Sequence, residues 1–257
     1  MAKKNFRYIY GPVSSWRLGS SLGIDLISRK EKVCSFDCIY CQLGRARVVT
    51  TKRRVFVATA KIIKEIKSLP PLKIDYITFS GTGEPTLAKN LGQAIRAIKR
   101  IRKEKVAVLT NSSLMHRKDV QKDLSLADFV IVKLDAHSQD LFAKINQPVE
   151  TIKLDEVIKA IRRFKKSFRG RLALQIMFVK ENKEYAKQIA SVAKDIKPDE
   201  VQINTPLRPC GVRPLCKKKL DKIKRYFRGI NCISVYDRKR KKVNPISKKA
   251  TLKRRTK

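Results

Sequence analysis

The sequence predicts an α/β fold built mainly from parallel strands that alternate with helices. Short apolar runs alternate with segments of helical periodicity along most of the chain. The runs are apolar on both faces, as in sheets covered by helices, and parallel strands need crossover connections. No long Gly/Ser linker interrupts the alternation. We therefore expect one core domain over residues 1–237, with functional groups at the carboxyl ends of its strands.

Six strands are expected, each a short run of apolar, often β-branched or aromatic, side chains. They are Leu22–Ile27, Tyr76–Ser80, Val106–Thr110, Phe129–Asp135, Leu172–Val179 and Val201–Asn204. Between the strands, apolar residues recur with the period of an amphipathic helix. These helical stripes are Ile62, Ile63, Ile66 and Leu69; Ile95, Ile98 and Ile101; Leu154, Val157, Ile158, Ile161 and Phe164; and Ile189, Val192 and Ile196.

The last twenty residues, 238–257, have a different composition. Eleven of them are Lys or Arg and none is Asp or Glu. Such a block repels itself and has little to bury, which predicts a flexible basic tail. The tail could serve only as a solubilising terminus, or as an arm that neutralises phosphates.

The whole chain is strongly basic, with 61 Lys and Arg against 22 Asp and Glu and a formal charge of +39. Thermophilic enrichment usually raises Glu together with Lys, so it does not explain this excess. A field of this sign attracts polyanions, and we expect RNA, DNA or a nucleotide-like partner. No stretch approaches the roughly 18 apolar residues of a membrane helix. The N-terminal residues lack the apolar core of a signal peptide. We therefore expect no membrane contact and a cytoplasmic location.

Three of the six cysteines, Cys34, Cys38 and Cys41, lie within eight residues. A disulfide is disfavoured in a reducing compartment and would leave one thiol over. Structural zinc requires four ligands, and the two histidines, His116 and His137, lie far away in sequence. Buried thiols that act as small apolar groups would not need this spacing. A [4Fe–4S] cluster is the fourth alternative, in which three thiolates leave one iron open to another ligand.

The pattern Cys34-x3-Cys38-x2-Cys41, with Tyr40 just before the last cysteine and a strand upstream, resembles the signature of the radical S-adenosylmethionine (SAM) superfamily. The resemblance implies a partial (β/α)6 radical SAM barrel. It also implies a [4Fe–4S] cluster on the three cysteines and SAM bound at the open iron, with Tyr40 near the adenine.

A second motif supports the resemblance. The residues Gly81, Thr82, Gly83 and Glu84, followed by Pro85, come directly after the strand Tyr76–Ser80. They are similar to the Gly-Gly-Glu-Pro turn with which that family binds the amino group of SAM. Glycines let a backbone approach a ligand closely, although Thr82 replaces the first glycine of the usual pair. Without the cysteines, an ordinary turn between a strand and a helix would explain these residues.

Polar residues near the ends of the other strands are further cofactor candidates. By similarity to the family, Asn111, Asp135 and Gln175 are expected near the carboxylate and ribose of SAM. They could instead make ordinary loop hydrogen bonds. Lys133 should share a face with Asp135, and could contact a substrate or simply pair with that aspartate.

The activity implied by the resemblance is reductive cleavage of SAM. One electron from the cluster would split SAM into methionine and a 5′-deoxyadenosyl radical, which abstracts a hydrogen atom from the substrate. A one-electron donor such as flavodoxin or ferredoxin is also implied. The protein holds the reacting groups and excludes water. No catalytic residue of the chain itself is assigned.

The other cysteines, Cys210, Cys216 and Cys232, follow the last expected strand, the first two in a proline-rich segment. They could hold a second iron–sulfur cluster, or they could be scattered free thiols.

Within the superfamily, the segments 11–19, 23–25, 41–44 and 80–86 are most similar to the branch that contains the tRNA wyosine-synthesis enzymes and their uncharacterised relatives. A basic chain fits a tRNA substrate. The wyosine enzymes carry an extra cluster on upstream cysteines, whereas no cysteine precedes Cys34. Two alternatives remain: an enzyme acting on a peptide or small metabolite, and a non-catalytic iron–sulfur protein that binds nucleic acid.

Overall fold

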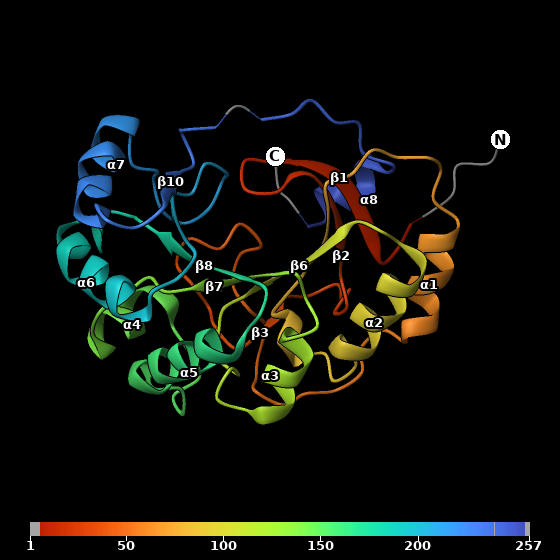
Figure 1. The fold of residues 1–257 in the computed structure, drawn as a ribbon, viewed down its shortest axis with the longest axis horizontal. Coiled ribbons are helices and arrows are strands. Elements are labelled where there is room, and N and C mark those ends of the chain that lie inside the picture. The colour runs from red at the N-terminus through yellow and green to blue at the C-terminus, as the bar shows by residue number, and fades with distance from the viewer. Residues whose placement is uncertain (1–5, 239, 255–257) are drawn as a thin grey trace.

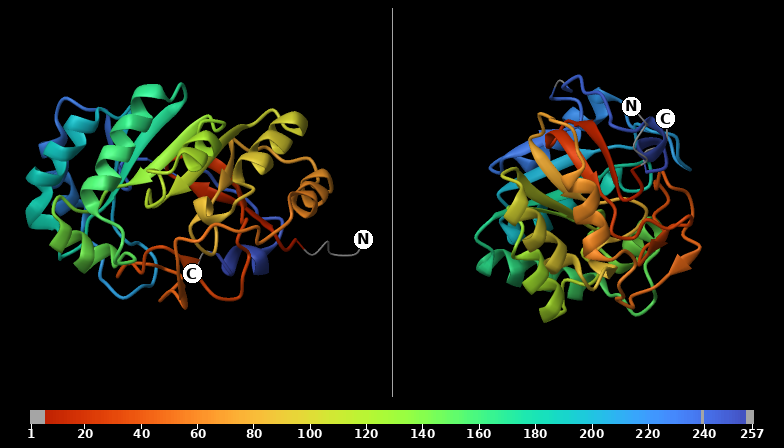
Figure 2. Two further views of the ribbon diagram at one scale, coloured as in Figure 1. Left: turned by 90° about the horizontal axis from the view of Figure 1, so that it is seen from below. Right: turned by 90° about the vertical axis from the view of Figure 1, so that its right-hand side faces the viewer.

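The computed structural model describes residues 6–238 and 240–254. Its main sheet has the strand order β1-β2-β5-β6-β7-β8-β9-β10 and curls into a half-barrel, with helices on its outer side (Figures 1 and 2). All neighbouring strands are parallel except β1 and β2, which form an antiparallel hairpin. The strands are β1 Ile9–Ser15, β2 Gly19–Ile24, β5 Tyr76–Phe79, β6 Lys105–Thr110, β7 Phe129–Lys133, β8 Arg171–Met177, β9 Glu200–Asn204 and β10 Cys232–Ser234.

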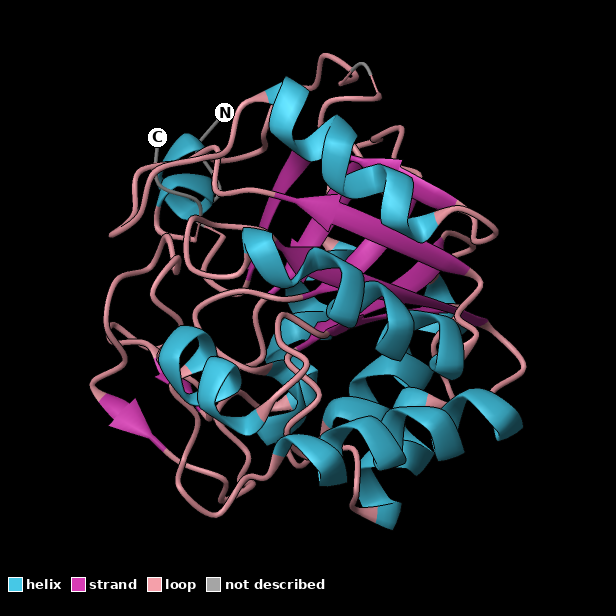
Figure 3. Ribbon diagram, turned by 90° about the vertical axis from the view of Figure 1, so that its left-hand side faces the viewer, coloured by secondary structure: helices cyan, strands magenta, loops and turns pink. Residues whose placement is uncertain are grey.

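Most of the helices lie between successive strands as crossover connections. The four expected helical stripes are confirmed at residues 59–67, 91–101, 154–167 and 186–196, and the other helices were not expected. The helices are α1 Thr59–Lys67, α2 Leu91–Ile101, α3 Lys118–Leu124, α4 Gln139–Asn146, α5 Leu154–Ser167, α6 Ala186–Ile196, α7 Lys217–Lys224 and α8 Lys248–Leu252, with the 3-10 turns η1 Pro85–Leu87, η2 Lys183–Tyr185 and η3 Arg225–Phe227. A second, two-stranded sheet of β3 Val33–Cys34 and β4 Val48–Val49 lies apart from the main sheet, among loops (Figure 3).

The α/β half-barrel and all six expected strands are confirmed, and the differences concern strand ends and edges. β7 stops at Lys133, because the Asp135 side chain accepts a hydrogen bond from Met177 N (2.7 Å) in place of ladder pairing. β1 was not expected because it contains a Gly-Pro pair and two serines, which are poor signals for a strand. β10 was not expected because it has only three residues.

The half-barrel has apolar layers on both faces of its sheet. The larger layer fills the space between the sheet and the helices. A smaller group on the inner face consists of Leu18, Ala107, Phe129, Ile131 and Ala173. Beyond this group, toward the carboxyl ends of the strands, Lys133, Gln175 and Gln202 lie in register on β7, β8 and β9. The inner face therefore changes from apolar to polar at the end where a ligand is expected.

The basic tail, predicted to be flexible, makes defined contacts with the core over residues 240–254. This segment leaves the β10 side of the sheet and crosses to the β1 side, where α8 packs beside β1 (Figure 1). Ile246 N donates to the carbonyl of Gly11 (2.6 Å), and Lys241 pairs with Asp75 (2.6 Å). The side chain of Arg254 is buried. Composition alone missed this docking, because the charge of Arg254 is neutralised by a partner more than 200 residues away in sequence.

Among the described residues, no helix has the length and apolar character needed to cross a membrane.

Candidate functional site

A cavity of about 210 Å³ opens at the carboxyl ends of the central strands. The three clustered cysteines and both glycines of the Gly81–Glu84 turn contribute to its wall, together with the ends of β6, β7 and β8. Its polar lining residues are Lys32, Cys34, Cys38, Cys41, Ser80, Glu84, Thr110, Asn111, Lys133 and Gln175. The fold thus brings together two motifs that lie about 40 residues apart in sequence.

The loop that carries the cysteines is held in shape by its own polar contacts. Lys32 Nζ donates to Asp37 Oδ1 (3.0 Å) and to the carbonyl of Gly44 (3.1 Å), and its side chain is 5% exposed. The same carboxylate oxygen accepts from Ala46 N (2.7 Å). Cys41 N closes a turn onto the carbonyl of Cys38 (3.0 Å). These contacts fold the loop around a cation–carboxylate pair, so that three thiols reach one cavity.

All three thiols are free and partly buried. Burial raises the pKa of Cys34 well above its usual range, and the carboxylate of Glu84 adds to the rise. Burial also raises the pKa of Cys38 to about 11, although Lys133 opposes the shift. Thiolates at these positions therefore need a positive partner, which a metal centre supplies.

The side chain of Glu84 ties the motif turn to the end of β6. Its Oε1 accepts from Thr86 N (3.0 Å), Thr86 Oγ1 (2.7 Å) and Thr110 Oγ1 (2.7 Å), and its Oε2 accepts from Asn111 N (2.7 Å). The residue is 2% exposed, and burial raises its pKa in spite of these donors. Glu84 thus fixes the relative position of two loops that line the cavity.

The two glycines of the turn allow close approaches that a larger residue would prevent. A Cβ on Gly83 would lie 1.8 Å from the carbonyl oxygen of Val33, the residue before Cys34. Gly81 has a φ of +143°, and a Cβ there would lie 2.4 Å from Cγ of Asp25. Backbone hydrogen bonds from Val33 N to Thr82 O and from Glu84 N to Val33 O (both 3.2 Å) join the turn to β3. The turn therefore rests directly on the strand that carries the first cysteine.

Asn111, expected to be a cofactor contact, lies between the two motifs. Its Nδ2 donates to Ser35 Oγ (2.8 Å) and approaches Cys34 Sγ (3.6 Å). Ser35 Oγ in turn bonds to Ser113 Oγ (2.6 Å). The side chain of Asn111 therefore faces the cavity and at the same time orients the Cys34 loop.

Asp135 lies behind Tyr40 and is fully buried, with both carboxylate oxygens engaged. One oxygen accepts from Met177 N, and the other accepts from the Tyr40 hydroxyl and from Asn146 Nδ2 (2.7 Å). Lys133 Nζ lies 3.7 Å from Asp135 and 4.7 Å from the centre of the Tyr40 ring. Tyr40 and Lys133 face the cavity, and the aspartate holds both in place.

Asn146 was not expected as a site residue. It ends α4 on the buried side of that helix, and its Nδ2 also donates to Tyr40 Oη (3.0 Å) and approaches Cys38 Sγ (3.5 Å). An amide among the buried residues Leu141, Phe142 and Ile145 was a signal for it, because buried polar groups require partners.

A second cavity of about 290 Å³ adjoins the first, and the two share Tyr40, Cys41 and Gln175. The second cavity lies between the β1–β2 hairpin, the loop after β9 and the segment near Arg240. Its wall includes Trp16, Arg17, Gln42, Asn204, Arg208 and Arg240. Gln175, a predicted cofactor residue, thus stands where the two cavities meet.

The remaining cysteines do not join this site. Cys210 Sγ contacts the carbonyl of Val212 (3.3 Å), Cys216 is exposed before α7, and Cys232 lies on β10 with a pKa raised to about 12 by burial. Among the described residues, no three His, Cys, Asp or Glu side chains are placed to hold a single metal ion. That absence concerns sites for one metal ion. A [4Fe–4S] cluster needs a different arrangement, because each of its thiolates binds a different iron.

The clustered cysteines fit such a group. Three free thiols line one cavity, and the second cavity adjoins it at Tyr40, Cys41 and Gln175. Amide groups of Asn111 and Asn146 lie within 3.6 Å of two of the sulfurs, and such contacts are typical of thiolate ligands.

Comparisons with known proteins agree with this geometry. Residues 32–193 match the family model of the radical SAM superfamily. The chain is 42% identical over 205 residues to a UPF0026 protein of Synechocystis sp., a match that covers 79% of this chain and 77% of that protein. It is 35% identical over 221 residues to a UPF0026 protein of Methanocaldococcus jannaschii, with 83% and 68% covered.

The fold is also similar to that of a solved structure, SuiB of Streptococcus suis bound to S-adenosylmethionine, with a TM-score of 0.62 at 14% identity. The match covers 80% of this chain and 48% of SuiB, so this chain corresponds to about half of that protein. Together with the family match over the cysteine motif, these likenesses show that the chain belongs to the radical SAM superfamily, as an enzyme of that type.

Proposed function

We propose that this protein holds a [4Fe–4S] cluster on Cys34, Cys38 and Cys41 and cleaves SAM reductively in the adjoining cavity. The observation that carries the proposal is that the three thiols line one cavity together with Gly81, Gly83 and Glu84 of the motif turn. When bound, the cluster supplies the electron that splits SAM into methionine and a 5′-deoxyadenosyl radical, which removes a hydrogen atom from the substrate. Three protein ligands leave one iron for SAM.

The chain's own residues bind and orient SAM. The backbone of Gly81 and Gly83, which Glu84 braces from behind, is the binding surface for the amino group of SAM. Thr82, also predicted as a cofactor residue, does not line the cavity, because its carbonyl accepts from Val33 N and its hydroxyl donates to Asp25. Asn111 and Gln175 offer side-chain amides to its carboxylate and ribose. Tyr40 supplies an apolar face beside the adenine. Asp135 acts through Tyr40 and Lys133, because its own oxygens are already engaged.

Anaerobic reconstitution tests the proposal. We expect about four irons per chain, and 5′-deoxyadenosine and methionine in equal amounts under a strong reductant. The matched control is Cys38→Ala, which should lose the iron and the cleavage together. A parent protein that holds the cluster but yields no 5′-deoxyadenosine would favour the alternative of a non-catalytic iron–sulfur protein that binds nucleic acid.

We further propose an RNA substrate, with tRNA as the first candidate and the wyosine branch as the related chemistry. The second cavity supports this choice, because it presents Arg17, Arg208 and Arg240 next to the aromatic residues Trp16 and Tyr40. Guanidinium groups suit phosphates and aromatic rings suit bases. The charge of +39 adds a long-range attraction for a polyanion.

Filter binding with bulk tRNA at two salt concentrations tests the RNA proposal. Affinity should fall steeply with salt, since each phosphate contact releases counterions. Arg208→Gln should weaken binding, whereas Arg100→Gln, at an exposed position of α2, should have a smaller effect. Weak binding that does not depend on salt would favour a peptide or small metabolite as substrate.

The proposal also includes an external electron donor and a second iron–sulfur cluster. A flavodoxin or ferredoxin is the proposed one-electron donor. A second cluster on Cys210, Cys216 and Cys232 is tested by the same iron analysis: about eight irons per chain support it, and about four argue against it.

A further inference from the structure

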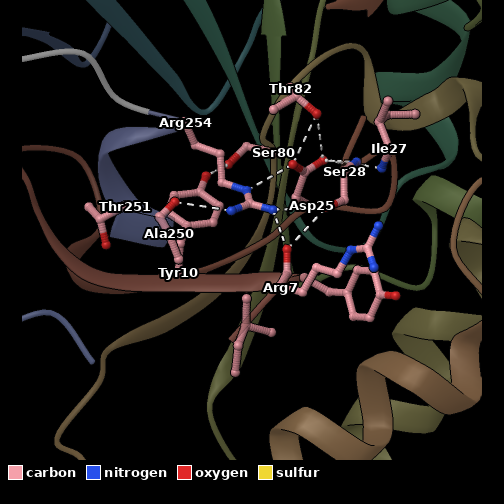
Figure 4. A network of polar contacts seen from close by, with 12 residues as sticks. Arg7, Tyr10, Asp25, Ile27, Ser28, Ser80, Thr82, Ala250, Thr251 and Arg254 are labelled. Carbon is pink, nitrogen blue, oxygen red and sulfur yellow. Dashed lines mark hydrogen bonds and ion pairs between the residues drawn. The ribbon is translucent and has the colours of Figure 1, made fainter. Parts of the chain in front are cut away.

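The C-terminal segment ends in a buried ion pair behind the Gly81–Glu84 turn (Figure 4). Arg254 Nε donates to Asp25 Oδ2 (2.8 Å), and each of the two side chains is 1% exposed. The guanidinium also donates to Ser28 Oγ (2.9 Å) and to the carbonyl of Ala250 (3.0 Å). Its carbon atom Cζ lies 5.4 Å from the centre of the Tyr10 ring. The planar group is thus held on several sides at once.

Asp25 transmits this contact to the turn. Thr82 Oγ1 donates to Asp25 Oδ2 (3.0 Å), the oxygen that Arg254 also binds. Gly81 packs so closely on Asp25 that a Cβ would meet its Cγ at 2.4 Å. The preceding residue, Ser80, bonds through Oγ to the Tyr10 hydroxyl (2.6 Å), on the ring that Arg254 covers. Gly81 and Thr82 therefore contact Asp25 of the ion pair, and Ser80 contacts Tyr10, which packs against Arg254.

The burial of Asp25 makes Arg254 necessary. Asp25 Oδ1 is satisfied by the backbone N–H groups of Ile27 (3.1 Å) and Ser28 (2.8 Å), while Oδ2 depends on Arg254 and Thr82. A buried carboxylate that loses its cation is left without compensation, so its side chain must move or admit water. Either change rearranges the side chain against which Gly81 is packed.

Arg254 also reaches the cysteine loop. Its carbonyl accepts a hydrogen bond from Gln42 Nε2 (3.2 Å), and Gln42 directly follows Cys41. One residue near the C-terminus therefore contacts supports of both walls of the cavity.

We infer that Arg254 is a positioning residue for SAM: through Asp25 it holds the Gly81–Glu84 turn in the conformation that receives the amino group. This inference rests on the proposed function for its ligand. It gives the docked basic segment a role in the site that does not involve RNA.

The test compares Arg254→Gln with Lys249→Gln in the full-length chain. Lys249 is exposed on the same short helix, α8, so its substitution removes the same charge without touching Asp25. Two readouts are used: hydrogen exchange of residues 78–86 in the cofactor-free protein, and the Kd for SAM after reconstitution. Exchange of α5, on the far part of the sheet, reports global destabilisation.

For Arg254→Gln we expect exchange in residues 78–86 to be at least about tenfold faster with α5 unchanged, and SAM binding to be at least about tenfold weaker at an unchanged iron content. Lys249→Gln should match the parent. Arg254→Lys keeps the positive charge but loses the several N–H donors of the guanidinium. Its exchange rate and SAM affinity should lie between those of Arg254→Gln and Lys249→Gln. Should the Gln variant not fold, the Lys variant decides, with effects of roughly three- to tenfold expected.

The inference would be overturned if hydrogen exchange of residues 78–86 and SAM affinity in Arg254→Gln stayed within about twofold of the parent. It would also be overturned if exchange in α5 accelerated as much as exchange in residues 78–86. If the parent itself binds no SAM, the proposed function fails, and the exchange comparison still decides whether Arg254 orders the turn.

Discussion

Replacing Gly83 with Ala should separate the motif turn from the strand that carries Cys34. The added Cβ would lie 1.8 Å from the Val33 carbonyl oxygen, whereas such contacts are not found below 3.0 Å, so the two backbones must move apart by about 1.2 Å. Both hydrogen bonds between the turn and Val33, now 3.2 Å, would then exceed about 4 Å. Two lost backbone bonds and their unsatisfied groups cost about 2–5 kcal/mol, or roughly 4–10 °C in Tm for a chain of this size.

The assay is thermal unfolding of the cofactor-free chain, followed by iron content and SAM affinity after reconstitution. Gly229→Ala is the control: Gly229 has a φ of +86°, but a Cβ there would meet no atom within 4 Å, so the substitution adds about 1 kcal/mol of backbone strain without a clash. For Gly83→Ala we expect the larger loss of Tm and SAM binding at least about tenfold weaker. If the two variants had equal Tm values and both bound SAM like the parent, the argument that the turn rests on Val33 would be refuted.

Cys41→Ser should lower the iron content from about four per chain to near zero, as measured colorimetrically, because a cube needs all three thiolates of this loop. Tyr40→Phe removes a hydroxyl that bonds both Asp135 and Asn146, and should lower the free energy of unfolding by about 1–3 kcal/mol and weaken SAM binding; unchanged stability and affinity would show that this network is dispensable. The guanidinium of Arg117 holds the pKa of Asp119 far below its usual 3.8, so this carboxylate stabilises the fold at neutral pH and loses that effect as the pH falls. Asp119 is half exposed, so Asp119→Asn should cost about 0.5–1 kcal/mol at pH 7 and less below about pH 4, whereas an equal cost at both pH values in cofactor-free unfolding would contradict the shift.

The repeating parts of the fold were predictable from sequence because they depend on local patterns. Apolar runs and helical stripes identified the six expected strands and the helices α1, α2, α5 and α6. The short helices α3, α4, α7 and α8, of five to eight residues each, were not predicted. β1 was not predicted because its Gly-Pro pair and serines are weak strand signals, although its hairpin with β2 is local. The three-residue β10 was not predicted because it is short and pairs only with the sheet edge at β9. Composition alone also suggested a flexible tail, since the signal for docking is one arginine among many.

In the site, too, the residues of local motifs were predictable and those that depend on long-range packing were not. The cysteine spacing and the Gly81–Glu84 turn are contiguous motifs, and the structure brings them to one cavity. The supports behind them, Asp25, Asn146 and Arg254, are polar residues that become buried only through long-range packing. Asp135 was predicted in part. Its position at the end of a strand was expected, but its hydrogen bonds with Tyr40 and Met177 were not.

The most direct test of the central claim uses electron paramagnetic resonance of the reduced, reconstituted protein with and without SAM. If three cysteines leave one iron open beside the Gly81–Glu84 turn, adding SAM should shift the signal, and nitrogen-15 in its amino group should give a measurable hyperfine coupling. A signal that SAM leaves unchanged, in a protein that holds about four irons per chain, would contradict the account.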